Sequence, residues 1–382
     1  MSLSIGCQFD SGAIRVIDAS NPGHIRLAIR DDNAGDFRQW FHFRISGAAG
    51  TALNLRFENA GQCSYADGWH GYQVCASYDR EHWFRLPDTH YDGQVLHLSF
   101  TPEQDAVWLA YFEPYSHERH QSLVAFAAQQ PGVVLRKLGE SVQGREIDCL
   151  QIGEPEAGKP KVWIVARQHP GETMAEWFVE GLLDRLLDPA DGVGRALRAS
   201  ACFQIVPNIN PDGAFLGNLR SNAAGANLNR EWLNPTLQRS SEVLCVREAM
   251  EAGGVDLFLD IHGDETLPYV FVDGSQMVPG YGERNQALQE QFLSTFAACA
   301  PDFQRKEGYA EDRFDEELLT LASKWVGHRF NCVSMTLEMP FKDNANAPDP
   351  VTGWNGARSA RLGRDILLPV LGHVRALASK VE

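Results

Sequence analysis

Residues 162–172 read Val-Trp-Ile-Val-Ala-Arg-Gln-His-Pro-Gly-Glu, an apolar run followed by a turn that carries His169 and Glu172. An apolar run that ends at a turn is typical of a strand buried in a sheet. A second such run, Val255–Ile261, ends at His262. Open α/β sheets place their active sites at the carboxyl ends of their strands. The sequence therefore predicts an α/β fold with these three polar residues at one end of its sheet.

Two histidines and a carboxylate are a ligand set that catalytic zinc uses, with a further position left for water. Pro170-Gly171 forces a turn, so that His169 and Glu172 can point to one spot above the sheet. Taken alone, this pair also suits a solvated surface contact. The second histidine at the end of another strand favours a zinc site. We therefore expect one zinc ion per chain, bound by His169, Glu172 and His262.

The surroundings of His262 support the same interpretation. The residue lies in Asp260-Ile261-His262-Gly263-Asp264. Gly263 leaves room for close approach, and either Asp260 or Asp264 could orient the imidazole ring by a hydrogen bond. The alternative is a core histidine bonded to a neighbour. We favour the ligand.

A carboxylate interrupts a later apolar run. Glu338 lies in Ser334-Met335-Thr336-Leu337-Glu338-Met339-Pro340. A lone buried carboxylate is costly unless it is paired or hydrogen bonded. One interpretation is a structural pair with an arginine. The other is a general base that takes a proton from water and returns it to a leaving amine.

The loop Gly217–Trp232 is too polar and too rich in glycine to belong to the core. It contains Arg220, Asn229 and Arg230. A guanidinium suits a developing oxyanion, and an Asn-Arg pair suits a carboxylate. Alone, the loop is equally compatible with a solvated surface. Beside a zinc site, it indicates a substrate clamp.

The chain divides into two parts of different pattern. Residues 1 to 128 contain short alternating or aromatic-rich runs with no amphipathic segment of helix length, which predicts an antiparallel β-sandwich domain. After the break at Gln129-Gln130-Pro131-Gly132, residues 129–382 predict a hairpin and then alternating strands and helices. This order predicts a mixed sheet covered by helices on both faces, an α/β/α domain. The expected elements are strands 133–138, 146–152, 202–206 and 332–337 and helices 174–187, 242–250, 284–298 and 359–379.

Composition limits the partners and the compartment. The net charge of −16, from 34 basic and 50 acidic residues, argues against nucleic acid or anionic membranes as partners. No apolar stretch approaches the length of a membrane span, and residues 1–7 show no secretory signal. The eight cysteines form no CxxC pair. Such cysteines suit a reducing compartment, so we expect a cytoplasmic protein.

The candidate site residues lie in motifs that resemble those of a known family. Across residues 132–382 the sequence resembles the zinc metallocarboxypeptidases of the carboxypeptidase A type. Within that family, Gly-Asn-Leu-Arg (217–220), the preceding β domain and Tyr-Phe-Glu-Pro-Tyr-Ser-His (111–117) look like the cytosolic carboxypeptidase branch. The pieces that match the family, in chain order, are Gly-Glu-Ser-Val-Gln-Gly-Arg (139–145), His-Pro-Gly-Glu (169–172), Pro-Asn-Ile-Asn-Pro-Asp-Gly (207–213), Asn-Leu-Asn-Arg (227–230), Asp-Ile-His (260–262) and Thr-Leu-Glu (336–338).

The resemblance implies a role for each matching residue. His169, Glu172 and His262 would bind zinc, and Glu338 would be the general base. Arg220 would stabilise the oxyanion, while Asn229 and Arg230 would hold the terminal carboxylate of the substrate.

The family also uses a mobile tyrosine before the general base, and here the match fails. Tyr309 is the nearest preceding tyrosine, and the sequence leaves open whether it takes the family position. Lys324 and Arg329 are candidates for reading an acidic side chain, although both equally suit a solvated face.

We therefore expect a metallocarboxypeptidase that hydrolyses the C-terminal bond of peptides or proteins. The branch resemblance implies a preference for C-terminal glutamate or another acidic residue. One alternative is a related amidohydrolase that deacylates a small N-acyl amino acid. The other is a binding protein with a vestigial site. The sequence leaves the oligomeric state open.

Overall fold

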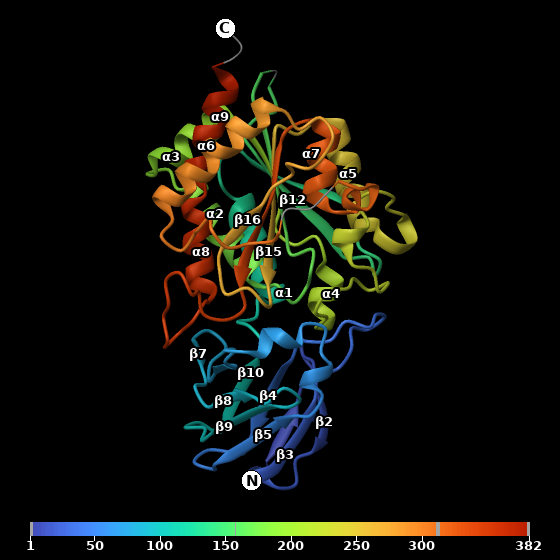
Figure 1. Ribbon diagram of the computed structural model, residues 1–382, viewed down its shortest axis with the longest axis vertical. Helices are drawn as coiled ribbons and strands as arrows, with labels where there is room; N and C mark the ends of the chain where they lie inside the picture. The colour runs from blue at the N-terminus through green and yellow to red at the C-terminus, as the bar shows by residue number, and fades with distance from the viewer. Residues whose placement is uncertain (1–2, 157, 311–313, 380–382) are drawn as a thin grey trace.

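The computed structural model describes residues 3–156, 158–310 and 314–379. Two bodies lie end to end along the long axis of the molecule (Figure 1). The smaller body contains the N-terminal strands, and the larger body contains a sheet between layers of helices. The expected class, an α/β/α domain preceded by a β domain, is confirmed.

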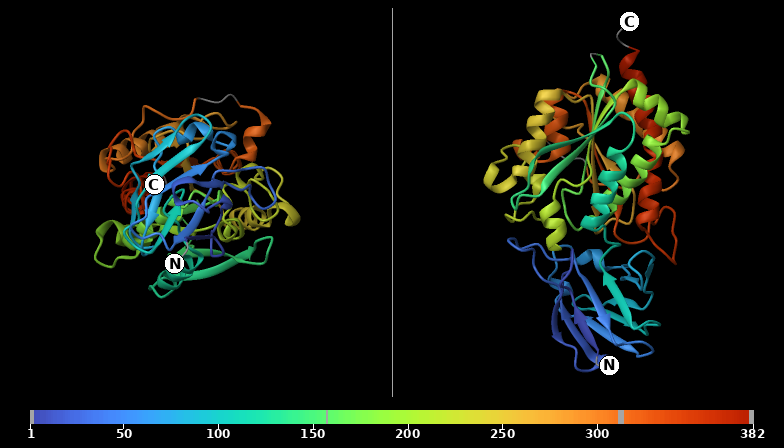
Figure 2. Two further views of the ribbon diagram at one scale, coloured as in Figure 1. Left: turned by 90° about the horizontal axis from the view of Figure 1, so that it is seen from below. Right: turned by 180° about the vertical axis from the view of Figure 1, so that it is seen from behind.

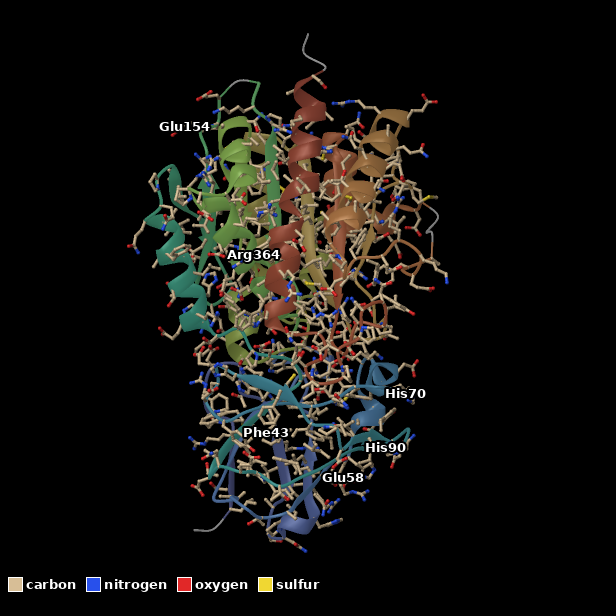
Figure 3. The ribbon with its side chains drawn as sticks, turned by 90° about the vertical axis from the view of Figure 1, so that its left-hand side faces the viewer. Phe43, Glu58, His70, His90, Glu154 and Arg364 are labelled. Carbon is tan, nitrogen blue, oxygen red and sulfur yellow. The ribbon has the colours of Figure 1, made fainter. Side chains whose placement is uncertain are left out.

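The smaller body contains two five-stranded sheets, in the orders β1-β4-β10-β6-β7 and β2-β3-β5-β9-β8. Neighbouring strands are antiparallel except β3 and β5, which pair in parallel. Apolar and polar residues alternate, so that Leu53, Leu55 and Phe57 are buried while Asn54 is exposed. Figure 3 shows Phe43 within this body, where it is fully buried. The strands are β1 (Ser4–Gly6), β2 (Arg15–Asp18), β3 (Ile25–Ala28), β4 (His42–Ser46), β5 (Leu53–Phe57), β6 (Cys75–Ser77), β7 (Trp83–Arg85), β8 (Thr89–Tyr91), β9 (Leu96–Phe100) and β10 (Ala106–Ala110).

The larger body is built on a seven-stranded mixed sheet in the order β11-β12-β14-β13-β15-β17-β16. The central strands β14, β13, β15 and β17 are parallel, and the remaining neighbours pair antiparallel. The predicted hairpin is β11 with β12. The strands are β11 (Val133–Glu140), β12 (Glu146–Ile152), β13 (Lys161–Ala166), β14 (Cys202–Val206), β15 (Leu257–Asp264), β16 (Phe271–Asp273) and β17 (Val333–Pro340).

Helices cover both faces of this sheet, because its central strands are apolar on both sides (Figure 1). Val162 and Ile164 of β13 pack in the core beneath α2, whereas Trp163 and Val165 pack in the core beneath α5 and α7. The helices are α2 (Met174–Leu187), α3 (Gly192–Ser200), α4 (Pro211–Leu216), α5 (Leu237–Gly253), α6 (Glu283–Cys299), α7 (Ala322–Phe330), α8 (Gly356–Asp365) and α9 (Leu367–Ala378), with short 3-10 turns η4 (Leu228–Arg230) and η5 (Glu316–Thr320).

One helix lies where only strands were expected. α1 (His117–Ala128) begins at Ser116, whose side chain accepts a hydrogen bond from the Arg119 N–H. Its buried residues are His120, Leu123, Val124 and Ala127. This is the spacing of a helix face, but histidine occupies its first position, which obscured the pattern. α1 packs against β11, β12 and α2 of the larger body (Figure 2).

The single C-terminal helix expected over residues 359–379 is wrong in one respect. The structure has two helices, α8 and α9, separated at Ile366. Pro369 lies in the first turn of α9, where its ring removes the N–H that would bond to the Asp365 carbonyl. The Cys299 thiol lies 3.6 Å from that carbonyl oxygen and donates to it instead.

None of the helices in the described part of the chain combines the length and apolar character needed to cross a membrane.

Candidate active site

Three neighbouring parallel strands bring the predicted zinc ligands and base together. His169 and Glu172 follow β13, and His262 lies in β15. Glu338 lies in β17 directly opposite His262 in the strand register. The turn after β13 is held by Arg167, which adopts φ 59° and donates from Nε to the Pro170 carbonyl at 3.0 Å.

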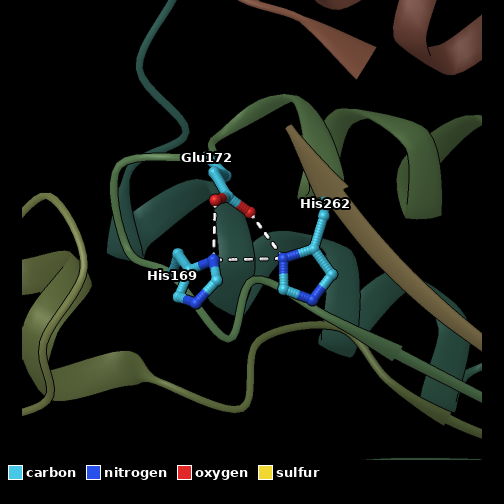
Figure 4. Close-up of side chains that lie close together, drawn as sticks. All are labelled: His169, Glu172 and His262. Carbon is cyan, nitrogen blue, oxygen red and sulfur yellow. Dashed lines mark hydrogen bonds and ion pairs between the residues drawn. The ribbon is translucent and has the colours of Figure 1, made fainter. Parts of the chain in front are cut away.

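His169, Glu172 and His262 form one buried cluster whose possible ligand atoms all lie within 4.8 Å of one another (Figure 4). Glu172 Oε1 lies 2.7 Å from His169 Nδ1, and Oε2 lies 2.8 Å from His262 Nδ1. The two Nδ1 atoms are 3.1 Å apart. Both rings therefore present the same nitrogen to the same carboxylate.

The outer ring nitrogens each face a hydrogen-bond acceptor. His262 Nε2 lies 3.0 Å from Asp260 Oδ2, and His169 Nε2 lies 3.0 Å from Asn227 Oδ1. A proton on each Nε2 leaves the Nδ1 lone pairs directed at the shared point, as metal-binding histidines require. Of the two aspartates considered from the sequence, Asp260 is therefore the one beside His262. The role of Asn227 was not recognised from the sequence.

The electrostatics of the cluster suit a cation. Burial and the nearby Arg220 lower the pKa of His169 to about 3, which keeps this ring neutral. Burial alone would raise the pKa of Glu172, but the two histidines outweigh it and lower the pKa. Burial alone would lower the pKa of His262, but Asp260 and Glu172 raise it well above the ordinary value. A metal cation competes for the same position as that proton, so the residues fit a zinc ion.

Glu338 is buried beside this cluster. Its Oε1 atom lies 3.1 Å from the Tyr309 hydroxyl, and its Oε2 atom has no hydrogen-bond partner among the described residues. Burial raises the pKa of Glu338 well above its ordinary value, and nearby Glu172 and Asp264 add to this effect while His262 opposes it. No arginine pairs with Glu338 among the described ion pairs, so the structural Glu–Arg pair considered from the sequence is not what the structure shows.

Tyr309 is the residue that the sequence could not assign. Its hydroxyl lies 2.7 Å from Asp264 Oδ2 as well as 3.1 Å from Glu338 Oε1, and its ring packs edge-on against Phe271. Burial and the carboxylates around it raise the pKa of Tyr309, so the hydroxyl keeps its proton. The only sequence signal was that Tyr309 is the nearest tyrosine before Glu338.

Arg220 lies beside the cluster. Its Nη1 atom is 3.8 Å from Glu172 Oε1, and its side chain is 14% exposed. The guanidinium carbon lies 5.8 Å from the ring centre of Phe37 and 5.3 Å from that of Tyr65. Both aromatic residues come from the N-terminal body, and the sequence did not indicate either.

Asn229 and Arg230 lie on the 3-10 turn η4 close to the cluster. Asn229 Oδ1 accepts a hydrogen bond from the Ala322 N–H at 2.9 Å, which turns the amide nitrogen away from this contact. Arg230 is exposed and donates to the Asn229 carbonyl.

Lys324 and Arg329, the two further cations considered from the sequence, differ in burial. Lys324 is buried, and its Nζ donates to Asp273 Oδ2 at 2.8 Å and to the Gly274 carbonyl. Arg329 is 53% exposed and lies 3.5 Å from Glu251. Lys324 lies in α7, two residues after Ala322, whose N–H bonds to Asn229, whereas Arg329 lies in a surface pair outside the cluster.

Parallel strands at the centre of the mixed sheet bring two histidines and two carboxylates to one buried place, and the loop after α4 adds Arg220. This is the arrangement of a metal-dependent hydrolase. The chain belongs to the zinc carboxypeptidase family, whose model matches residues 120–352. Residues 5–112 match the cytosolic carboxypeptidase N-terminal domain. The resemblance stated from the sequence is thus confirmed, and the protein is a metallocarboxypeptidase.

Individual relatives agree with this assignment. The crystal structure of a metallo-carboxypeptidase from Burkholderia cenocepacia is 52% identical, with a TM-score of 0.96 over 98% of this chain and 100% of that one. A Pseudomonas aeruginosa metallo-carboxypeptidase in complex with (2-guanidinoethylmercapto)succinic acid is 48% identical, with a TM-score of 0.94 over 98% and 100%. Mouse cytosolic carboxypeptidase 6 is 29% identical over 86% of this chain, which spans 64% of that relative's length.

Proposed function

We propose that this metallocarboxypeptidase holds one zinc ion with His169, Glu172 and His262 and releases one C-terminal amino acid from peptides or proteins. The observation that carries the zinc assignment is the convergence of two Nδ1 atoms on one buried carboxylate. The hydrogen bonds at both Nε2 atoms select the ring form that binds a metal.

The metal, when bound, supplies a Lewis acid that polarises the scissile carbonyl and makes water more acidic. Glu338 removes the proton from the attacking water and afterwards gives it to the leaving amine. Its free Oε2 atom is available for that proton, while Tyr309 holds Oε1. Two carboxylates near each other, one ionised and one with a raised pKa, are suited to these separate tasks.

The arginines select and stabilise the substrate. Arg220, close to Glu172, offers its N–H groups to the carbonyl oxygen as negative charge develops on it. Arg230 and the amide nitrogen of Asn229 bind the terminal carboxylate. A clamp of this kind restricts cleavage to chain ends.

We propose that the C-terminal residue of the substrate has an acidic side chain. Arg220, Arg230 and Lys324 concentrate positive charge near the cluster, and Lys324 follows Ala322, which bonds to Asn229. The Pseudomonas aeruginosa relative binds a succinic acid derivative, a molecule with two carboxylates. An acidic side chain would compete with Asp273 for the Lys324 ammonium group.

The test is a set of peptides that differ only in the last residue, with the released amino acid identified by mass. Chelation should abolish release, and added zinc should restore it. Glutamate and aspartate should be released faster than leucine or lysine. A matched set of N-acetyl amino acids separates a peptidase from a deacylase. Equal rates for all peptide ends would refute the acidic preference, and no metal-dependent release from any substrate would refute the enzymatic role.

We also propose that the protein works in the cytoplasm. All eight cysteines are free thiols in the structure, which suits a reducing compartment. The mouse relative is named a cytosolic carboxypeptidase. Fractionation of cells with an antibody to the protein tests the location.

A further inference from the structure

A segment of the N-terminal body, residues 30–37, hydrogen bonds to and packs closely against the loop that carries Arg220. Arg30 donates to the carbonyls of Leu216 and Gly217, and Asn33 exchanges hydrogen bonds with Asn218. Glycines allow the two backbones to approach. A Cβ atom at Gly225 would collide with the Ala34 carbonyl oxygen, and one at Gly35 would lie 2.8 Å from Ser221 Oγ.

Asp32 forms the centre of this contact. Asp32 is 6% exposed, and its carboxylate accepts hydrogen bonds from three consecutive backbone N–H groups. Oδ1 accepts from Leu219 at 2.6 Å, and Oδ2 accepts from Arg220 at 2.9 Å and from Ser221 at 2.8 Å. Hydrogen bonds to a buried carboxylate are stronger than those between neutral groups. The Asp32 carboxylate therefore fixes the backbone of Arg220 and of the residues before and after it.

The side chain of Arg220 is held by the same body. Phe37 and Tyr65 lie within cation–π range of its guanidinium. Gly68, in the same body, packs against Glu265, which follows His262 in the chain. The N-terminal body thus contacts both the backbone and the side chain of Arg220.

We propose that Asp32 is a positioning residue for Arg220. Through this residue the N-terminal body contributes to catalysis. Asp32 does not touch substrate. It fixes the loop so that the guanidinium meets the oxyanion. This inference rests on the role proposed for Arg220.

The test is Asp32→Asn, a change of nearly the same size. Oδ1 and Oδ2 both accept N–H groups, so the amide nitrogen of asparagine must face at least one donor whichever way it turns. We expect kcat to fall by about 10- to 100-fold, the effect of a displaced catalytic group. KM and zinc content should change little, because ground-state binding and the metal ligands are untouched. Tm should fall modestly, because a buried N–H group loses its acceptor. The control is Asp31→Asn, the adjacent carboxylate, which is 49% exposed and pairs with Arg38.

A double-mutant cycle with Arg220→Ala separates positioning from general damage. If Asp32 acts through Arg220, Asp32→Asn should slow the Arg220→Ala enzyme less than about twofold. An equal loss in both backgrounds, or an Asp32→Asn enzyme with wild-type kcat, would overturn the positioning role alone. Full activity of Arg220→Ala itself would overturn the role of Arg220 and this inference with it.

Discussion

In each histidine of the cluster, one ring nitrogen faces the proposed metal position and the other faces a hydrogen-bond acceptor. The inner Nδ1 atoms meet at Glu172, and the outer Nε2 atoms face Asp260 and Asn227. Neutral imidazole carries one proton, so the acceptor at the outer nitrogen decides which lone pair is free. The metal affinity of this site should therefore depend on residues that do not touch the metal.

Asp260→Asn should weaken zinc binding by about 10- to 100-fold, the usual effect of losing such a supporting carboxylate. Competition with a chelator measures the affinity. Asp264→Asn is the matched comparison, because Asp264 bonds to Tyr309 and not to His262. If Asp264→Asn lowered zinc affinity more than Asp260→Asn, the assignment of the supporting carboxylate would be reversed.

Glu338→Gln should lower kcat by about 10²- to 10⁴-fold, since the amide keeps the size of the side chain but cannot take a proton. Elemental analysis should find the same zinc content as in the wild type, because Glu338 lies outside the ligand cluster. An active Glu338→Gln enzyme would exclude this residue as the general base.

At the scale of elements, two helices approach more closely than ordinary side chains allow. α2 and α8 cross at Gly181 and Gly363. A Cβ atom at Gly181 would collide with the Ala360 carbonyl oxygen, and one at Gly363 would collide with that of Phe178. The helix α2 in this contact begins directly after the turn that contains His169 and Glu172.

Gly181→Ala should lower the free energy of unfolding by about 1–3 kcal/mol, because the backbone of α8 must move to admit the methyl group. Denaturant unfolding measures the change. Gly372→Ala is the control within a helix: a Cβ atom there would have its nearest neighbour 4.0 Å away, at Gln291 Nε2. This variant should be neutral or more stable by about 0.5–1 kcal/mol. Equal destabilisation by both changes would contradict a close crossing at Gly181.

Most elements could be predicted because their patterns are local. The strand and helix over residues 202–206 and 174–187 were predicted with the bounds that the structure gives. α1 was missed because its buried face includes His120, a residue whose burial depends on distant partners. The interruption at Ile366 was missed although Pro369 signals it.

At the scale of the whole molecule, His120 joins three elements. Its Nδ1 lies 2.8 Å from Glu176 Oε1 in α2, and its Nε2 lies 3.3 Å from Asp148 Oδ2 in β12. Glu176 also bonds to Arg167, which holds the turn that contains His169. Although burial would lower the pKa of His120, Asp148 and Glu176 outweigh it and raise the pKa to about 9.

The stability of the fold should therefore depend on pH above neutrality. The pKa of His120 is higher in the folded state than its ordinary value of 6.5. Its contribution is complete below about pH 6.5 and is lost as the pH rises through 9, by up to about 3 kcal/mol. Unfolding measured from pH 6 to pH 10 tests this, and His120→Gln should remove that part of the pH dependence. An unchanged pH profile in His120→Gln would exclude this histidine as the cause.

We propose the two domains as residues 1–128 and 129–382, with α1 in contact with both the sheet and α2 of the second. Hydrogen bonds from residues 30–37 to the Arg220 loop join the two domains beside the proposed active site. Separate expression of residues 129–382 should give a poorly active protein even where it folds.

The sequence by itself determined the class of fold, the zinc carboxypeptidase family and the strand ends that carry His169, Glu172, His262 and Glu338. The fold class and the strand ends follow from local patterns, since apolar periodicity and a turn are properties of neighbouring residues. The family follows from the resemblance of short motifs along the sequence. Only the tertiary structure decided that Asp260 supports His262, that Tyr309 meets Glu338, and that Asp32 holds the Arg220 loop. Each of these contacts joins side chains on separate elements, and their geometry is set by how the sheet, loops and N-terminal body pack together.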